Sequence, residues 1–274
     1  MPRLSMNELT TFRWSFDEDL LHYQRAGYDA IGVWRRKLTD FGEERAVELL
    51  TESGLAVSNL LWAGGFTGND GRTQAESLAD ARAAIRTAAV IDAGCLVLYT
   101  GGRNNHTQRH ADRLVRHALD TLLAEADAAG VTLAIEPMHA ACGGEWSVLS
   151  SLEETCTLLA DYAHPRLKMV YDTYHFPACD GVAAMLGELA PLIAVVHLGD
   201  TATPHSIDQE RCPLGEGGTP VREAIAGLIA AGYEGDFDVE LMGSATEGVA
   251  YPELLSRSRC LFREALSAAG AVPR

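Results

Sequence analysis

The sequence lacks the features that would tie the chain to a membrane or to a disulfide framework. None of its apolar runs reaches the ~20 residues that a membrane helix needs. The first residues contain no apolar segment of the kind that a secretory signal requires, so we expect a cytoplasmic protein that makes no membrane contact. Six cysteines are present, but none forms a CxxC pair, which argues against a disulfide scaffold or a zinc ribbon.

Positive charge is also scarce. The 274 residues include 22 Lys and Arg against 38 Asp and Glu, for a formal net charge of −16. An acidic surface repels phosphate backbones, so we expect no nucleic-acid partner. The 47% of hydrophobic residues is ordinary for a globular protein, and the chain can therefore bury a sizeable core.

The sequence does contain a regular alternation of short apolar runs and longer segments rich in Ala, Leu, Glu and Arg. The apolar runs, expected as strands, span 9–14, 28–34, 55–62, 94–100, 131–137, 167–172, 192–200 and 235–242. Helical patterns between them include 39–54, 73–94 and 107–130. Several helical segments end at a glycine just before the next run, as helices that close in a left-handed conformation do. These glycines are Gly27, Gly54, Gly94, Gly130 and Gly232.

A strand and a helix repeated eight times predict an α/β protein built of parallel units. Eight units within about 250 residues match the size of a (β/α)8 TIM barrel, here expected as one domain over residues 1–274. The alternative, an open doubly wound sheet, usually carries a glycine-rich phosphate loop after its first strand. The segment "FRWSFDED" is no such loop, which favours the barrel.

Four consecutive expected strands end in a residue that can bind a metal. These residues are Glu136, Asp172, His197 and Glu240, and a barrel places its active site at such strand ends. Each of them alone could be a helix cap, a turn former or a satisfied core residue. Burying all four of them among apolar neighbours costs free energy unless they are paired with one another or bound to a metal. Three carboxylates and one imidazole suit Mn²⁺, Mg²⁺ or Co²⁺, so we predict one divalent metal ion.

Further candidates lie near the same face. His175 follows Asp172 by three positions and is expected to contact the substrate or to support a ligand. Trp14, Trp34 and Trp62 are expected to close the first three strands. Trp146 follows the fifth strand. Such an aromatic wall suits the C–H groups of a sugar-like ligand, although tryptophan is also common at the rim of a core.

Five motifs, "IEPMH", "VYDTYH", "VVHLGD", "RCPLGEGG" and "FDVELM", resemble the sugar-phosphate isomerase/epimerase group of xylose isomerase-like TIM barrels. Its members include ketose 3-epimerases, hydroxypyruvate isomerases and inosose dehydratases. The motifs cover residues 131–242, and the first half of the chain matches only in architecture. The resemblance implies that the four strand-end residues bind one divalent metal. It also implies that Glu136 and Glu240 act as acid and base on opposite faces of the substrate, and that His175 and Arg211 hold substrate oxygens.

Two comparisons within this superfamily limit what the resemblance implies. Ketose 3-epimerases usually have a further substrate-binding Glu at the position of Cys142, so the resemblance does not fix the ketose. Endonuclease IV, a DNA-repair enzyme with three zinc ions, needs extra histidines after the third and fourth strands. It also needs a DxH motif in the seventh loop. Here those segments read "LLWAGG", "TGGRNN" and "SIDQERCPLG", which argues against DNA repair.

The sequence therefore predicts a divalent-metal-dependent isomerase or epimerase of a keto-sugar or a related hydroxy-carbonyl compound. The expected chemistry is proton transfer through an enediolate that is bound to the metal. A lyase or dehydratase acting on a keto-inositol or a 3-keto-glycoside is the alternative, because the same enolate can expel a leaving group. A non-catalytic sugar-binding subunit is a third hypothesis. The expected partner is a small sugar-like molecule, and a homo-oligomer is compatible with the sequence.

Overall fold

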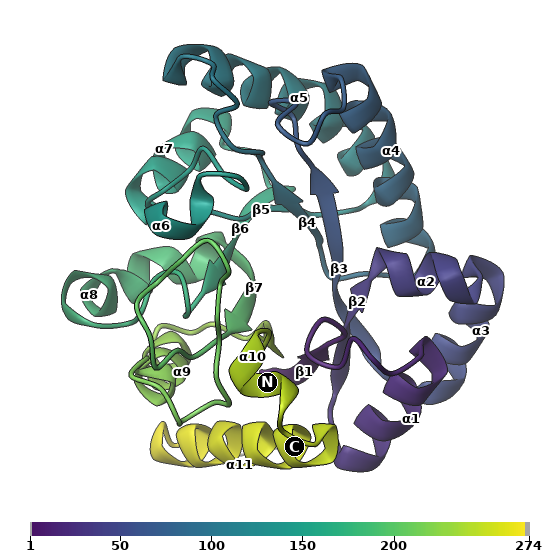
Figure 1. Cartoon of the computed structure of the whole chain (residues 1–274), viewed down its shortest axis with the longest axis vertical. Coiled ribbons are helices and arrows are strands. Elements are labelled where there is room, and N and C mark those ends of the chain that lie inside the picture. The colour runs from purple at the N-terminus through teal and green to yellow at the C-terminus, as the bar shows by residue number, and fades with distance from the viewer. Residues whose placement is uncertain (1, 272–274) are drawn as a thin grey trace.

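The computed structural model describes residues 2–271 and shows a closed barrel of eight parallel strands, each paired with its neighbours in chain order (Figure 1). The strands are β1 (Arg3–Asn7), β2 (Ala30–Trp34), β3 (Ala56–Gly64), β4 (Leu96–Tyr99), β5 (Leu133–Ile135), β6 (Leu167–Asp172), β7 (Ile193–Leu198) and β8 (Asp236–Val239). Pairing of β1 with both β2 and β8 closes the sheet. The predicted (β/α)8 TIM barrel is confirmed.

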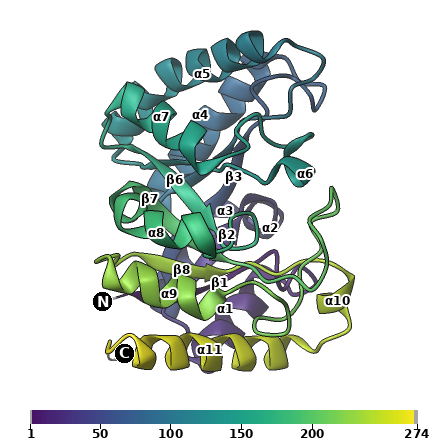
Figure 2. The ribbon, with the colours of Figure 1, turned by 90° about the vertical axis from the view of Figure 1, so that its left-hand side faces the viewer.

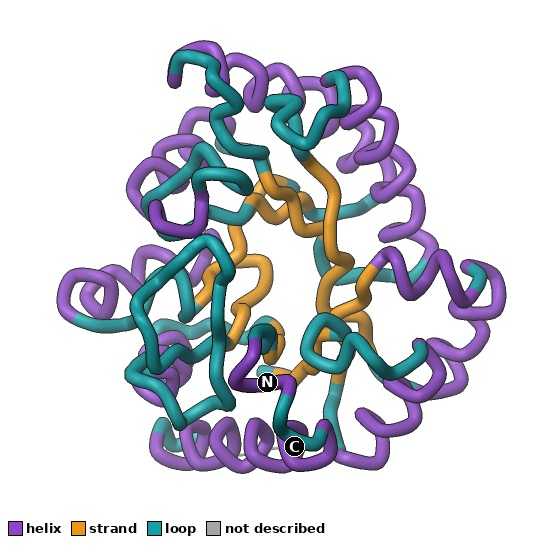
Figure 3. The backbone as a smooth tube through the Cα atoms, viewed as in Figure 1, coloured by secondary structure: helices purple, strands orange, loops and turns teal. Residues whose placement is uncertain are grey.

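Helices surround the strands on the outside, as the tube in Figure 3 shows. They are α1 (Phe16–Ala26), α2 (Arg35–Phe41), α3 (Glu43–Ser53), α4 (Gln74–Val90), α5 (Gln108–Ala129), α6 (Ala140–Gly143), α7 (Leu152–Tyr162), α8 (Asp180–Leu189), η1 (Ala190–Leu192), α9 (Val221–Ala230), α10 (Ser244–Glu247) and α11 (Tyr251–Ala268). The predicted helix 39–54 is two helices, because the backbone turns at Gly42 with a φ of 102°.

The helix ends follow local sequence signals. Thr73 and Thr107 cap α4 and α5 by accepting a backbone N–H with their hydroxyl groups. Gly130 closes α5 at a φ of 74°, a left-handed conformation that costs glycine little. Gly94 has a different reason to be glycine: a Cβ there would lie 2.6 Å from the carbonyl oxygen of Ser58.

The first strand was predicted in the wrong place. It spans Arg3–Asn7, and residues 9–14 form turns that lead into α1. In β1, Leu4 and Met6 pack in the main core, while Ser5 and Asn7 bond to polar groups of other strands. The polar side chains of Ser5 and Asn7 interrupt the apolar pattern of β1, so the sequence pattern favours the more apolar segment that follows.

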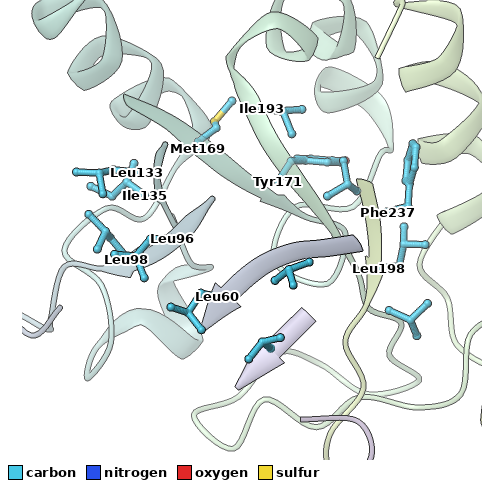
Figure 4. Packing of buried hydrophobic residues seen from close by; sticks show 14 of the residues in the cluster. Leu60, Leu96, Leu98, Leu133, Ile135, Met169, Tyr171, Ile193, Leu198 and Phe237 are labelled. Carbon is cyan, nitrogen blue, oxygen red and sulfur yellow. The ribbon is translucent and has the colours of Figure 1, made fainter. Parts of the chain in front are cut away.

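The apolar core lies mainly between the strands and the helices. Figure 4 shows ten labelled side chains of this layer, among them Leu96, Leu98 and Tyr171. A smaller apolar cluster contains Val97, Ala134, Val170 and Val195, which alternate with outer-layer residues along their strands. Because successive strand residues point to opposite faces, this cluster fills the inside of the barrel.

The two ends of the barrel differ. In Figure 2 the termini lie at one end, and α6, α10 and the loop between β7 and α9 lie at the other, where the strands end. We call this the mouth of the barrel. No helix among residues 2–271 has the length and apolar character needed to cross a membrane.

Candidate metal centre

Four buried side chains converge at the mouth of the barrel. Asp172 ends β6 and His197 lies near the end of β7, while Glu136 and Glu240 directly follow β5 and β8. One possible ligand atom from each residue lies within 4.8 Å of those of the others. Four adjacent parallel strands carry these residues to one place, because their carboxyl ends all meet there.

The polar atoms in this cluster lie close together but are poorly directed for hydrogen bonds to one another. Nδ1 of His197 lies 2.7 Å from Oε2 of Glu240 and 3.3 Å from Oε1 of Glu136. Neither Nδ1 of His197 nor Oε2 of Glu240 forms a well-directed hydrogen bond with any described residue. Buried polar atoms without partners are rare in folded proteins. Their convergence fits a divalent ion held by three carboxylates and one imidazole.

Burial and the neighbouring charges shift the pKa values of the residues in this cluster. Burial opposes protonation of His197, but the carboxylates of Glu240 and Glu136 outweigh it and raise the pKa of His197 well above its usual range. For Asp172, burial disfavours the charged carboxylate and raises its pKa to about 6, although the nearby Arg211 opposes the shift. For Glu240 the balance is reversed: Arg211 and His197 outweigh burial and lower its pKa to about 2.

Arg211 is buried and bonded to the carboxylate cluster. Its Nη2 donates to Oδ2 of Asp172 at 2.8 Å, and its Nη1 donates to the carbonyl oxygen of Glu240 at 2.9 Å. The guanidinium also lies 4.8 Å from the ring centre of Tyr174. The resemblance implies that Arg211 holds substrate oxygens, and at 2% exposure the side chain is buried at the site. Arg211 borders the cavity, but its guanidinium group is already paired with the carboxylate of Asp172.

His175 presents one nitrogen to the site. Its Nδ1 accepts the backbone N–H of His139 at 3.4 Å. Its Nε2 is buried, has no hydrogen-bond partner in residues 2–271, and lies 3.9 Å from Oδ2 of Asp172. Burial and the nearby Arg211 lower the pKa of His175 well below its usual range, so the ring is neutral. A neutral ring that accepts at Nδ1 carries its proton on Nε2 and can donate it to an oxygen.

A cavity of about 80 Å³ lies beside the carboxylate cluster. Both glutamates, His175 and Arg211 border it. The side chains around it are Leu61, Trp62, Tyr99, Glu136, Met138, Trp146, His175, Gln209, Arg211, Glu240 and Met242. Trp62, Tyr99 and Trp146 contact one another edge-on, with ring centres 5.6–6.4 Å apart. We call these three residues the aromatic corner.

Only part of the predicted tryptophan wall lies at this cavity. Trp62 and Trp146 border it, but Trp14 and Trp34 line a separate groove with Phe12 and Lys37. Trp14 does not close a strand; it follows the turns after β1 and stacks on His22 at 4.2 Å. The error for Trp14 follows from the misplaced first strand. Trp34 does end β2 as predicted, but it lines the separate groove.

Sequence reasoning missed Tyr99, Gln209 and Met242. Tyr99 is the last residue of β4, so the strand-end rule that found Glu136 would also have found it. Gln209 lies in the loop between β7 and α9 and carries no comparable signal. Cys142, where ketose 3-epimerases usually have a glutamate, is buried with its Sγ 3.8 Å from the hydroxyl of Tyr174 and does not border the cavity.

A further buried carboxylate lies below the cluster. Asp238 is the β8 partner of His197 in the sheet register, and it is fully buried inside the barrel. Its Oδ2 accepts amide hydrogens from Asn7 and Asn59 at 2.7 and 2.8 Å. Gly32 lies opposite this oxygen. A side chain there would clash with it, because a Cβ would lie only 2.3 Å away. The barrel interior is therefore polar beneath His197.

Solved structures of similar fold include enzymes that act on sugars. A protein of Sinorhizobium meliloti 1021 superposes with a TM-score of 0.86 and 24% identity, over 98% of each chain. The IolI protein with a bound zinc atom gives a TM-score of 0.83 and 18% identity, over 97% of this chain and 99% of that one. An L-ribulose 3-epimerase gives a TM-score of 0.81 and 19% identity, over 98% and 96%. These likenesses establish the fold.

The sequence family is established by a separate comparison. No curated protein matches the chain. The family model described as xylose isomerase-like TIM barrel matches residues 21–259, which is most of the chain and includes the whole carboxylate cluster. The chain therefore belongs to the family of xylose isomerase-like TIM barrels.

Proposed function

We propose that the protein is a divalent-metal-dependent isomerase or epimerase that moves a proton at a carbon next to a ketone. The observation that carries the proposal is the position of Glu136 and Glu240. Both belong to the four-residue cluster and both border the cavity. Sugar epimerases among the solved structures of similar fold support the same reading.

In this proposal Glu136, Asp172, His197 and Glu240 hold the metal. The carboxylate-rich ligand set favours Mn²⁺, Mg²⁺ or Co²⁺. When bound, the ion would polarise the substrate carbonyl and stabilise the negative charge that develops on its oxygen.

The protein's own residues would do the rest of the chemistry. One glutamate takes the proton from the carbon beside the carbonyl, and the other supplies a proton from the opposite face, which inverts the centre. Return of the proton to the neighbouring carbon gives isomerisation instead. His175 donates its Nε2–H to a substrate oxygen, and Arg211 holds Asp172 in place through the 2.8 Å contact.

Solvent exchange tests the proposal directly. The protein is loaded with Mn²⁺ and incubated in D₂O with a panel of ketoses and keto-inositols. Deuterium at one carbon of recovered substrate or product, seen by NMR, is the expected result. The matched control is Glu240→Gln, which keeps the side-chain shape but loses the base and should exchange ~10²–10⁴-fold more slowly.

Two other outcomes would change the assignment. Loss of a hydroxyl or a glycosidic group after exchange would identify a lyase, because elimination shares the first proton removal. Binding of a ketone without any exchange in the Mn²⁺-loaded protein would refute catalysis and favour a sugar-binding subunit.

A further inference from the structure

We infer that the substrate is an uncharged hydroxy-ketone whose end remote from the carbonyl is apolar, as in a deoxy sugar. The inference rests on the proposed function and goes beyond it by naming the substrate class. Its basis is the unequal chemistry of the two sides of the cavity. The carboxylate cluster comes from β5, β6, β7 and β8, and the aromatic corner comes from β3, β4 and the loop before α7.

The aromatic side offers almost nothing for a hydroxyl group to bond. The hydroxyl of Tyr99 is already used: it accepts from Nη2 of Arg72 at 2.9 Å and donates to Asp70 at 3.2 Å. Trp62 and Trp146 can donate an indole N–H but cannot accept a hydrogen bond. Leu61 adds only apolar surface. A substrate hydroxyl buried against these side chains would therefore leave its own hydrogen without an acceptor, which is unfavourable; Gln209, whose amide oxygen could accept, comes from the loop between β7 and α9 instead.

A phosphate group would also lack a partner. Arg211 borders the cavity, but its charge is paired with the carboxylates of Asp172 and Glu240 at 2.8 and 3.2 Å, and only its Nε lacks a hydrogen-bond partner in residues 2–271. Two other arginines lie behind the aromatic corner, and both are paired. Arg35 binds the carbonyl oxygen of Trp62 and the carboxylate of Asp80.

Arg72 is the second of these arginines. It bonds to Asp70 and Asp80 as well as to Tyr99. An anionic group placed at the aromatic corner would therefore be buried with no unpaired basic side chain beside it among the described residues. A buried charge without a partner is strongly unfavourable.

A methyl group has none of these difficulties. It would contact the faces and edges of the aromatic rings and the thioethers of Met138 and Met242, which pack readily against irregular apolar groups. The carbonyl and its adjacent hydroxyl would remain at the carboxylate cluster, within reach of His175. The cavity thus favours a molecule that is polar at one end and apolar at the other.

The experiment compares three compounds of the same stereochemistry: a 6-deoxyketohexose, its parent 2-ketohexose and the ketohexose 6-phosphate. The set is repeated for each stereoisomer with the Mn²⁺-loaded protein, and kcat/KM for deuterium uptake from D₂O is measured. We expect the deoxy sugar to exceed its parent by about tenfold to 100-fold, the discrimination that an apolar pocket achieves against a hydroxyl. We expect the phosphate to show no exchange.

Variants assign the preference to the aromatic corner. Trp146→Gln adds an acceptor at the cavity and should lower the ratio of deoxy to parent kcat/KM by about tenfold. Trp62→Gln should act in the same direction, so the test does not depend on one variant folding. Trp14→Gln, the matched control in the separate groove, should leave the ratio unchanged.

The outcomes separate the inference from the proposed function. Exchange with the parent sugar or the phosphate preferred over the deoxy sugar would overturn the inference and leave the isomerase intact. The inference would also be overturned if the ratio of deoxy to parent kcat/KM were the same in the native protein, Trp146→Gln and Trp62→Gln. The absence of exchange with every ketone would refute the proposed function, and the inference with it.

Discussion

At the scale of single residues, the site balances buried negative charge against two nearby basic groups. Three carboxylates lie around Arg211 and His197, which together hold the pKa of Glu240 at about 2 against the effect of burial. Glu240 is therefore ionised at neutral pH and available to bind a cation. The same carboxylates keep a proton on His197 whenever no metal displaces it.

Replacing Glu240 tests its role as a base. At saturating Mn²⁺, Glu240→Gln should retain the fold and lower the rate of deuterium uptake by ~10²–10⁴-fold, because an amide cannot accept the proton. The amide also binds a hard cation more weakly than a carboxylate does, so the metal content is measured in the same samples. Circular dichroism and the melting temperature check the fold, and NMR measures the exchange. A variant that exchanges at a near-native rate would show that another group removes the proton.

His175 should affect turnover and leave the metal in place. Its unpartnered Nε2 faces the site while its Nδ1 is held by His139. His175→Ala should therefore keep one divalent ion per chain by elemental analysis and lower kcat. Asp172→Asn is the contrasting variant and should lose metal, because a neutral amide replaces an anionic ligand on a hard cation. Loss of a second ion in His175→Ala would point to a multinuclear centre and to phosphoester hydrolysis instead.

At the scale of elements, the loop between β7 and α9 is organised by one carboxylate. Asp200 is fully buried and accepts backbone N–H groups from Thr201, Gly215, Gly217 and Thr219 at 2.8–3.1 Å. A Cβ at Gly217 would lie 2.2 Å from this carboxylate, so only glycine allows the close approach. The same loop carries Arg211 into the site, where its backbone N–H bonds to Met242.

Disturbing this carboxylate should loosen the loop. Asp200→Asn turns one acceptor oxygen into an amide group that faces N–H donors. We expect a loss of about 3 kcal/mol in the free energy of unfolding, since bonds to charged groups contribute ~1.5–3 kcal/mol each. Urea unfolding measures the loss, and hydrogen exchange should rise at Gly215, Gly217 and Thr219. Asp208→Asn, an exposed acid in the same loop, is the control, and equal exchange in both variants would contradict the argument.

At the scale of the whole molecule, barrel closure makes distant segments into one site. Glu136 and Glu240 are separated by about 100 residues, yet the strand order places their ends around the same cavity. Binding of a cation at this point should stabilise the whole barrel, because the ligands come from four strands and are together only in the folded state.

Metal binding should therefore raise the melting temperature in a pH-dependent manner. Mn²⁺ at 100 times its Kd should add about 2.7 kcal/mol to the free energy of unfolding. The pKa of His197 is raised in the metal-free fold, so its proton stabilises that fold at low pH and is lost as pH rises through the raised pKa. The gain from Mn²⁺ should grow over the same interval, because binding requires the deprotonated ring. Thermal scans with and without chelator measure it, and a gain that is unchanged in Asp172→Asn would argue against this site.

The sequence by itself determined the barrel and the four residues of the cluster. Eight apolar runs separated by helical segments leave few arrangements, and parallel strands necessarily end at the same side. Polar residues at the ends of four successive strands had to meet there. Thr107 and Gly130 marked the ends of a helix because capping depends on local backbone chemistry.

Only the tertiary structure decided where β1 lies, which aromatic residues border the cavity and where Arg211 points. Ser5 and Asn7 are polar and do not fit the apolar pattern of a buried strand. In the structure they bond to Ser58 and Asp238, which lie far along the chain. The sequence predicts both Trp14 and Trp146 near the mouth of the barrel, but the loop paths bring only Trp146 to the cavity. Periodicity shows which face of a strand is buried, whereas the folding of a loop depends on contacts with distant residues, such as those that Asp200 makes.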